Sequence, residues 1–497
     1  MRQRFLVLFI FFLNFLHANA QFNFEGKWIG ILKVNGMELD IHFNVKKNTL
    51  SAKEIFYQTR IDVPLQKLKN YPVDQTSLKK KIVLFEILNL QAKFSGKFID
   101  TNVIEGKFEQ RGQTFPMKLT KHWGALKVDK PQTPKRPYPY IEEKVTFSNQ
   151  DGKIKFSGTV TKPEETKTAE QTRSYPAIVL FSGSGSQDRD ESIGNHKLFA
   201  ILSDVFTKMG VVVLRVDDRG AGETKMSPEK YEYTTNDLIY DGVDYVNFIK
   251  KDGCVDTNQI FLLGHSEGGS IAFGVAKTCK IKGIIGLAPP LSSGKDINTF
   301  QNYWGLKNGG ASDEIILSYL FLHEMILNEF SKHDTILNKN KQIEIIHSCI
   351  NNWKSNNKDL KKNHYKPVIK YFEKLYKDKF APVLVGIYAP LNENGWFQNF
   401  IQSNPATDAV QLNIPMLILQ GKMDQQIPYE KSMESVNQLK LVGKNVEFLG
   451  FEGHNHLLQH CKTGNTNEYL SNDETISQEV IDAATKWLKI QISDQRH

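Results

Sequence analysis

The chain has 497 residues, of which 40% are hydrophobic, 24% charged and 11% aromatic. This composition is typical of a globular protein and excludes a disordered or fibrous chain, and the length predicts more than one domain. The formal net charge of +8 comes from scattered lysines with short runs such as Lys79–Lys81. A solvated surface explains that pattern better than a nucleic-acid-binding face, so we expect no nucleic-acid partner.

The first 20 residues have the features of a secretory signal peptide. Arg2 and Arg4 precede residues 5–16, which are apolar except for one asparagine, and Ala18–Ala20 (Ala-Asn-Ala) is a small-x-small cleavage site. The alternative is an N-terminal membrane anchor, but the apolar run is too short to cross a bilayer. We therefore predict that residues 1–20 are removed and that the mature protein is exported, periplasmic or secreted, without stable membrane insertion.

Residues 21–125 are predicted to form a small antiparallel β domain. Apolar and polar residues alternate in residues 28–34 and 37–43, and Asn35-Gly36 between them is typical of a two-residue hairpin. A barrel or a sandwich fits this pattern. The domain carries no cluster of catalytic residue types, so a structural role or ligand binding is expected. Further strands are predicted at residues 82–88, 92–98, 103–110 and 114–119.

A proline-rich linker at residues 126–140 separates this domain from a different pattern. Four prolines between positions 131 and 139 exclude a helix or an inner strand there. From residue 141 onward, short wholly apolar strands alternate with helical stretches, which indicates a parallel sheet buried on both faces. The predicted fold class is therefore α/β, a doubly wound, mostly parallel sheet. Its strands are predicted at residues 176–181, 211–216, 260–263, 283–287, 416–419 and 446–451.

One interval interrupts the alternation of strands and helices. Residues 296–404 show amphipathic helical patterns, such as 314–330 and 340–353, and no convincing buried strand. The interval is too long for an ordinary loop. We predict a helical cap inserted into a sheet core made of residues 141–295 and 405–497.

The four cysteines do not suggest a metal site. Cys254, Cys279, Cys349 and Cys461 lack the CxxC spacing of zinc sites. Cys254 and Cys279 each precede a predicted parallel strand at the same end of the sheet. An exported location permits disulfides, so a bridge between these two is one alternative and free thiols are the other.

Ser266 is the candidate nucleophile. It lies in Gly264-His265-Ser266-Glu267-Gly268, between the strand at residues 260–263 and a helical stretch at residues 270–277. Gly-x-Ser-x-Gly in that setting is a nucleophile elbow, in which small neighbours permit a sharp turn. The N-terminus of the following helix favours negative charge beside the serine.

A nucleophilic serine needs a base and an acid that orients the base, and after an elbow the expected order is Ser, acid, His. Asp424 follows the strand at residues 416–419 and is the acid candidate, whereas Asp408 is weaker because it precedes that strand. His454 and His456 follow the last strand, and their local spacing does not separate them as bases.

Two backbone groups are candidates for the oxyanion hole. One is the N–H of Glu267, directly after the nucleophile, and the other is the N–H near Ser184, in the loop after the strand at residues 176–181. Charged residues elsewhere in these loops have other predicted roles. We interpret Asp217–Arg219 as an ion-pair and turn cluster that supports the site, and we assign His196 and Lys197 to the pocket lining.

Motifs in both halves of the predicted core match a known family in order. They are residues 183–191, 196–197, 217–222, 264–269, 421–428, 455–459 and 463–475. These stretches resemble the α/β-hydrolase superfamily and, more narrowly, exported bacterial esterases of the serine aminopeptidase-like group, which carry an N-terminal β domain. The resemblance covers roughly residues 141–295 and 395–490. The helical insertion departs from it in length and in its Lys and Asn content, so substrate preference does not transfer.

The resemblance implies Ser266 as nucleophile, Asp424 as acid and His456 as base, because the family pattern Asn-His-Leu-x-Gln fits residues 455–459. The implied reaction is acyl transfer: the histidine takes the serine proton, the serine attacks an ester carbonyl, and water releases the acid. No metal or organic cofactor is required. We expect a serine carboxylic-ester hydrolase acting on small or carbohydrate-linked acyl esters.

Three alternatives to the esterase remain open. One is a serine aminopeptidase-like peptidase with the same triad, in which Glu267 or Asp188 anchors a substrate amine. Another is a thioester hydrolase, which is less natural outside the cytoplasm. The third is an exported binding protein that uses the β domain and retains a relic hydrolase domain.

Overall fold

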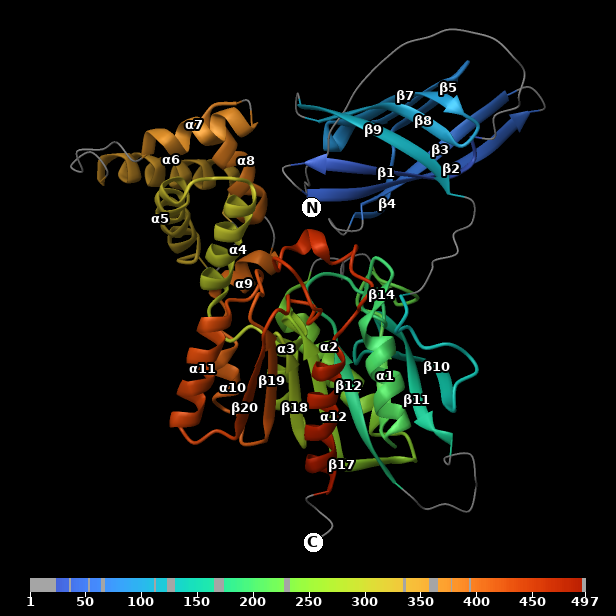
Figure 1. Ribbon diagram of the computed structural model, residues 1–497, viewed down its shortest axis with the longest axis vertical. Coiled ribbons are helices and arrows are strands. Elements are labelled where there is room, and N and C mark those ends of the chain that lie inside the picture. The colour runs from blue at the N-terminus through green and yellow to red at the C-terminus, as the bar shows by residue number, and fades with distance from the viewer. Residues whose placement is uncertain are drawn as a thin grey trace. The chain divides into compact units, whose positions relative to one another are not determined.

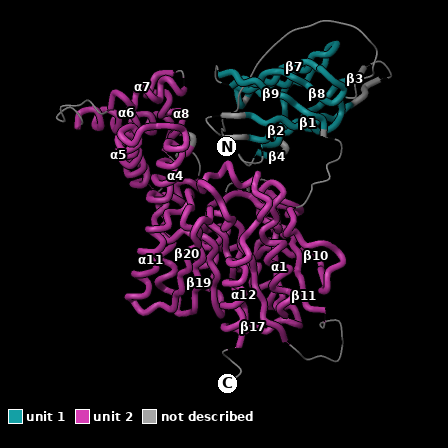
Figure 2. The backbone as a smooth tube through the Cα atoms, in the orientation of Figure 1, with its two compact units in different colours: residues 1–128 teal, residues 129–497 magenta. Residues whose placement is uncertain are grey.

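A computed structural model gives the structure of the chain (Figure 1). It describes residues 24–34, 37–51, 54–63, 68–110, 113–122, 130–164, 174–227, 233–333, 337–356, 365–376, 378–392 and 395–493. The chain divides into two compact units, residues 1–128 and 129–497 (Figure 2). The signal peptide predicted at residues 1–20 lies outside the described ranges. Within those ranges, no helix combines the length and the apolar character needed to cross a membrane.

The first unit is a nine-stranded antiparallel sheet that forms a half-barrel. The strands lie in the order β4-β3-β2-β1-β9-β8-β7-β6-β5. The predicted hairpin is confirmed, because β1 and β2 pair from Gly26↔Val45 to Val34↔Met37, although its Asn35-Gly36 turn is outside the described residues. The strands are β1 (Gly26–Val34), β2 (Met37–Ser51), β3 (Glu54–Val63), β4 (Leu68–Pro72), β5 (Gln75–Lys79), β6 (Ile82–Ile87), β7 (Ala92–Asp100), β8 (Val103–Gln110) and β9 (Gln113–His122).

The core of this unit is aromatic. Phe43 stacks on Phe85 with ring centroids 4.2 Å apart, and Trp28 meets Phe98 edge to face at 5.3 Å. All four side chains are buried. Aromatic pairs of this kind add stability beyond the area that they bury, so the alternating apolar face of the strands holds the half-barrel together.

The second unit is built on a mixed sheet with the strand order β10-β11-β15-β12-β17-β18-β19-β20 (Figure 1). From β15 to β20 all neighbours are parallel, whereas β10 and β11 are antiparallel, which confirms the predicted fold class. The strands are β10 (Tyr140–Ser148), β11 (Ile154–Pro163), β12 (Tyr175–Phe181), β15 (Val212–Val216), β16 (Lys225–Met226), β17 (Val255–His265), β18 (Gly283–Leu287), β19 (Met416–Gly421) and β20 (Val446–Phe451), with a separate two-stranded ribbon of β13 (Ser192–Ile193) and β14 (His196–Lys197).

Helices cover both faces of this sheet, as the wholly apolar strands require. Along β12, Ile178 and Leu180 join the apolar cluster under α1 (Leu198–Lys208) and α12 (Gln478–Ser493). Val179 and Phe181 point the other way. They join the cluster under α2 (Thr235–Ile249), α3 (Glu267–Ala276) and α11 (Tyr429–Leu441).

Between β18 and β19 the chain leaves the sheet and forms a helical cap. Its helices are α4 (Gly294–Asn308), α5 (Asp313–Phe330), α6 (Lys339–Asn356), α7 (Tyr365–Tyr376), α8 (Phe380–Asn392) and α9 (Gly395–Gln402), and the short α10 (Ala406–Ala409) leads back to the sheet. Ser293 and Ser312 cap the first two helices by accepting from backbone N–H groups. The helices share an apolar cluster of their own around Trp353.

The four cysteines, Cys254, Cys279, Cys349 and Cys461, are free thiols in the structure. The bridge that the sequence allowed between the first two is therefore not formed.

A buried histidine makes the cap sensitive to acid. His323 on α5 is 1% exposed, its Nδ1 lies 2.6 Å from the hydroxyl of Tyr388, and its Nε2 has no hydrogen-bond partner in the described part of the chain. Burial lowers the pKa of His323 to about 4, so the folded cap holds the ring neutral. The unfolded chain binds this proton near pH 6.5. The contribution of the neutral His323 ring to the free energy of unfolding is therefore fully present above pH 6.5. It is lost as the pH falls from 6.5 through 4.

We expect the Tm of the wild-type protein to fall between pH 7 and pH 4.5, and the fall to be smaller in His323→Leu. The depressed pKa corresponds to about 3 kcal/mol at most. Circular dichroism melts at the two pH values measure this effect, with the exposed His347→Gln on α6 as the control variant. If the Tm of His323→Leu falls as far as the Tm of His347→Gln, His323 is not the acid-sensitive group.

Candidate active site

Ser266 lies at the turn between β17 and α3. Its backbone has φ 51° and ψ −126°, a left-handed conformation that residues other than glycine seldom adopt. Hydrogen bonds from Ser266 N to Leu287 O and from Gly269 N to Ser266 O, both 2.9 Å, hold the turn. The side chain is half-buried, whereas His265 and Glu267 on either side are buried. This is the strained strand-to-helix geometry of a nucleophile elbow.

Asp424 and His456 form a buried acid–base pair in the loops that follow β19 and β20. His456 Nδ1 lies 2.8 Å from Asp424 Oδ2, and each residue is 3% exposed. Asp424 Oδ1 accepts from Gln426 N at 2.7 Å and from Ile427 N at 2.9 Å, so two amides fix the carboxylate. A neutral ring paired in this way carries its proton on Nδ1 and keeps a lone pair on Nε2, as a general base needs.

The residues on either side of His456 build a tight turn. Asn455 Oδ1 accepts from Leu457 N at 3.0 Å and from Gln459 N at 3.1 Å, and Asn455 Nδ2 donates to Gln459 Oε1 at 2.9 Å. Both amide side chains are fully buried. The asparagine and glutamine of this motif therefore have a structural task, which is to present the histidine between them.

The weaker candidates for acid and base have other partners. Asp408 Oδ1 pairs with Lys277 Nζ at 2.6 Å near the surface. His454 precedes the base candidate by two residues, but its Nε2 lies 3.1 Å from Glu479 Oε1. Asp408 is therefore paired elsewhere, and His454 faces Glu479 rather than Asp424.

His265 connects the elbow to the loop after β20 that carries His456, residues 452–460, which we call the base loop. Its Nε2 lies 3.2 Å from His456 O, and the two rings have centroids 5.1 Å apart. Neither Ser266 Oγ nor His456 Nε2 forms a hydrogen bond with any described residue. In unliganded hydrolases the serine–histidine hydrogen bond is often long and tightens only with substrate.

A second buried acid–histidine pair lies beside the elbow. Glu191 Oε1 is 2.8 Å from His265 Nδ1 and also accepts from Gly183 N at 2.7 Å. Burial acts to lower the pKa of His265, but the charge and hydrogen bond of Glu191 outweigh it and the pKa is raised. One carboxylate thus ties the loop after β12 to the elbow and, through His265, to the backbone of His456. Glu191 and His265 are 74 positions apart in the chain, so no local sequence pattern indicates their pairing.

The two predicted oxyanion donors lie on segments that meet at Ser266. A Cβ atom added to Gly183 would lie 3.1 Å from Ser266 Cβ, so the loop after β12 runs against the nucleophile. Gly183 N donates to Glu191 and so does not serve as an oxyanion donor. The next amide along the loop is that of Ser184, which is the predicted donor. The N–H of Glu267 is the first of α3, and the first N–H groups of a helix lack an intrahelical acceptor.

Glu267 also connects the elbow with the cap. Its Oε1 accepts from Trp396 Nε1 on α9 at 2.7 Å and from Thr235 Oγ1 at the start of α2 at 2.5 Å. Its Oε2 is buried and has no hydrogen-bond partner among the described residues. The cap therefore reaches the site through α9, directly beside the nucleophile.

Two models of protein families match the chain: Serine aminopeptidase, S33, over residues 193–328, and Prolyl oligopeptidase family, over residues 354–476. Esterase EstD of Thermotoga maritima is 26% identical over 354 residues, which cover 71% of this chain and 68% of EstD. The chain is therefore similar in sequence to hydrolases of these families and to an esterase.

Solved structures with similar chains include an esterase and a peptidase. The Pyrococcus furiosus esterase Pf2001 matches with a TM-score of 0.41 and 15% identity over 75% of this chain and 100% of its own. A putative dipeptidyl aminopeptidase IV from Bacteroides ovatus matches with a TM-score of 0.42 and 13% identity over 94% of this chain and 50% of its own.

The contacts of Asp217–Arg219 brace the loops around the candidate site. Asp218 Oδ2 accepts from Ser182 Oγ at 2.6 Å and from Gln187 N at 3.0 Å, and burial raises the pKa of Asp218 to about 8. Arg219 forms a bidentate pair with Asp241 of α2. These contacts join the loop after β12 to the loop after β15, which is a structural task.

His196 is buried rather than exposed to a pocket. Its Nδ1 lies 2.8 Å from Thr475 Oγ1 and its Nε2 lies 2.8 Å from Tyr469 O. Burial, followed by the charge of Lys130, lowers the pKa of His196 to about 4, so the ring is neutral near pH 7. The neighbouring Lys197, in contrast, does line a pocket.

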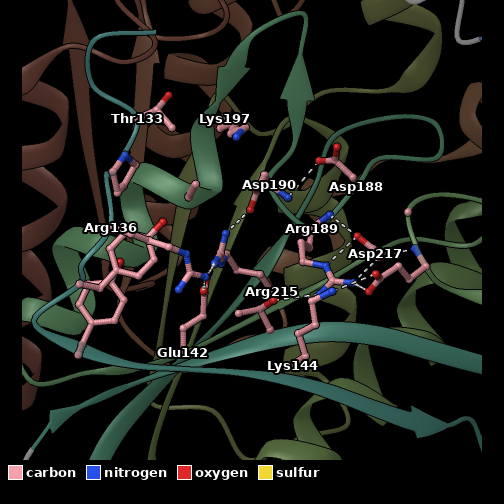
Figure 3. A pocket seen from close by; sticks show the side chains of 17 residues that line it. Thr133, Arg136, Glu142, Lys144, Asp188, Arg189, Asp190, Lys197, Arg215 and Asp217 are labelled. Carbon is pink, nitrogen blue, oxygen red and sulfur yellow. Dashed lines mark hydrogen bonds and ion pairs between the residues drawn. The ribbon is translucent and has the colours of Figure 1, made fainter. Parts of the chain in front are cut away.

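That pocket, of about 540 Å³, is lined mainly by charged and polar side chains (Figure 3), and Asp424 and His456 are not among its lining residues. Its charged side chains largely pair with one another: Arg215 with Asp190, and Arg189 with Asp217 at 2.6 Å. Ser266 is not among the lining residues. The ion pairs connect β15 and the residue that follows it to the segment after β12, and Arg189 also donates to Gly158 O of β11 at 2.8 Å, so we interpret these charges as structural.

Proposed function

We propose that the protein is a serine hydrolase of carboxylic esters that acts through Ser266, Asp424 and His456. One observation carries the proposal: a strained elbow presents the serine, and the buried acid–base pair is tied to that elbow by the contact between His265 and His456. The similarity to an esterase supports an ester as the substrate.

The mechanism follows from the placement of these groups. His456 Nε2 removes the proton from Ser266 Oγ as the oxygen attacks the ester carbonyl, and the resulting oxyanion accepts from the amides of Ser184 and Glu267. Collapse of the tetrahedral intermediate expels the alcohol, which takes the proton back from His456. A water molecule then repeats the sequence on the acyl-enzyme. Asp424 keeps the Nδ1 proton in place and stabilises the imidazolium ion.

We further propose that the substrate is a small or carbohydrate-linked acyl ester and that the mature protein, from residue 21, acts after export. The signal-peptide pattern of residues 1–20 supports export. The contact between Trp396 of the cap and Glu267 supports a substrate site that the cap covers.

A peptidase that removes short N-terminal units is the second candidate. The observation that favours it is the buried, unpartnered Oε2 of Glu267, beside the nucleophile. A substrate ammonium group would form a charge-assisted hydrogen bond there, whereas an ester substrate offers no such donor.

A hydrolysis panel on residues 21–497 separates the candidates. It compares p-nitrophenyl acetate, butyrate and octanoate with aminoacyl and dipeptidyl p-nitroanilides. Ester turnover supports the esterase, and its chain-length profile gives the size of the acyl pocket. Anilide cleavage with little ester turnover would favour the peptidase over the esterase. Turnover of neither class would favour a binding protein with a relic hydrolase domain.

The glycines of the elbow give a steric test of the proposed site. A Cβ at Gly264 would lie 2.1 Å from Gly268 O, and a Cβ at Gly268 would lie 2.0 Å from Phe181 O, so neither fits without a backbone shift. We expect Gly264→Ala to displace Ser266 and to lower kcat/KM about 100-fold, because small misplacements of reacting groups cost that much.

The matched control for this substitution is Gly253→Ala. A Cβ at Gly253 meets nothing within 4 Å, so its kcat/KM is expected to stay within about twofold of wild type. Kinetics are measured together with the Tm of each variant. Wild-type activity in Gly264→Ala would show that the turn does not position the nucleophile.

A further inference from the structure

His454, His460 and Glu479 bring three potential metal ligands together behind the base loop. Glu479 Oε1 lies 3.1 Å from His454 Nε2 and 3.3 Å from His460 Nε2, and the three ligand atoms all lie within 4.8 Å of one another. His454 and His460 also face each other across an isolated β-bridge. The proposed reaction uses none of the three, so their arrangement needs another explanation.

The other nitrogen of each ring has a partner that fixes the tautomer. His454 Nδ1 lies 2.6 Å from Glu452 O, and a carbonyl oxygen only accepts, so Nδ1 carries the proton. His460 Nδ1 lies 3.0 and 3.1 Å from the two carboxylate oxygens of Glu474, with the same consequence. An imidazole whose single proton is on Nδ1 presents a lone pair on Nε2. Histidines that bind metals are commonly held in this way, by a carbonyl or a carboxylate on the opposite nitrogen.

The Nε2 atom of His454 is buried and unsatisfied. The residue is 0% exposed, and this atom has no hydrogen-bond partner in the described ranges, although a carboxylate oxygen of Glu479 lies 3.1 Å away. A lone pair that faces a carboxylate oxygen at this distance is repelled by it. A cation or an additional proton between the two atoms removes the repulsion, and buried polar groups without any partner are rare.

Two of the three separations between the ligand atoms fit a small tetrahedral ion, and the third is within 4.8 Å. Zinc binds histidine nitrogen and carboxylate oxygen at about 2.0–2.1 Å, which places neighbouring ligand atoms about 3.3 Å apart. The two separations from Glu479 Oε1, 3.1 and 3.3 Å, agree with that value. Two imidazoles and one carboxylate favour zinc and its neighbours among transition metals over magnesium or calcium.

We propose that His454, His460 and Glu479 bind one divalent transition-metal ion, best matched by Zn²⁺, with water as the fourth ligand. The side chains of His460 and Glu479 are 62% and 55% exposed, so solvent reaches the ion. The ion ties the segment between the two histidines, which carries His456, to the first turn of α12. Its task is to hold the base loop, and its binding is independent of the proposed ester hydrolysis.

The test uses the mature chain without a polyhistidine tag, stripped of metal with a chelator. Calorimetric titration with Zn²⁺ and elemental analysis of the dialysed protein are expected to give one ion per chain. His460→Ala and Glu479→Gln are expected to weaken zinc binding at least 10-fold. Both positions are exposed, so the variants are expected to fold, which circular dichroism checks. His347→Ala, an exposed histidine of α6, is the matched control and keeps wild-type affinity.

Thermal melts give a second readout that does not depend on activity. Zinc at 100 times the wild-type Kd is expected to raise the Tm of the wild-type protein by about 3 °C and to raise that of Glu479→Gln by at most about half as much. The proposal is wrong if the stripped wild-type protein binds no zinc, or if His460→Ala and Glu479→Gln bind it as tightly as wild type. In that event a protonated His454 paired with Glu479 explains the cluster.

Discussion

Replacing Ser266 with alanine is expected to lower kcat for ester hydrolysis by about 10⁵- to 10⁶-fold, because no acyl-enzyme forms without Oγ. Alanine keeps the Cβ atom, so the left-handed backbone at φ 51° is as strained as before and the Tm should be unchanged. The measurement is single-turnover and steady-state kinetics with the best ester of the panel. Ser270→Ala, one turn further along α3, is the control and should retain wild-type kinetics.

A loss of 10-fold or less in Ser266→Ala would contradict the nucleophile assignment. It would mean that another group attacks the ester, or that a water molecule does so directly. An equal loss in Ser270→Ala would instead point to damage to α3, and the melts would detect that.

Replacing Asp424 with asparagine is expected to lower kcat about 10⁴-fold with little change in KM. Asp424 Oδ2 accepts from His456 Nδ1, and an amide group at that position would present N–H to the ring and favour the wrong tautomer. The amides of Gln426 and Ile427 still have Oδ1 as their acceptor, so the loop should keep its shape.

Asp408→Asn is the matched control for this substitution. Asp408 pairs with Lys277 near the surface, and such pairs contribute at most about 1 kcal/mol to stability. Its kcat is expected to stay within about twofold of wild type. The two variants are compared in the same steady-state assay. A larger loss of kcat in Asp408→Asn than in Asp424→Asn would assign the role of the acid to Asp408 instead.

The sheet of the second unit could be predicted because its strands are largely apolar. Val212–Val216 and Gly283–Leu287 are buried along their whole length, and apart from Arg215 each is an apolar run between polar loops. In the first unit, β5 (Gln75–Lys79) was missed because it is polar and only partly buried at the end of the sheet. An edge strand of this kind has little apolar alternation, and only its pairing with β6 reveals it.

The parts of the candidate site that follow from neighbouring residues in the sequence could be predicted. The contacts between residues far apart in the chain could not. The elbow around Ser266 and the aspartate after β19 follow from strand ends and turn residues. Spacing alone could not choose between His454 and His456, and the choice came from the resemblance. The contacts of Glu191 with His265 and of Glu267 with Trp396 join residues 74 and 129 positions apart, so no local pattern indicates them.

Covalent labelling identifies the residue that attacks the substrate. Residues 21–497 are treated with a fluorophosphonate, which reacts with activated serines, and the adduct is located by peptide mass spectrometry. We expect one adduct per chain, on the peptide that contains Ser266, with loss of ester turnover in proportion to labelling and no adduct in Ser266→Ala. An adduct on another serine, or ester turnover that persists in protein labelled at Ser266, would contradict this expectation.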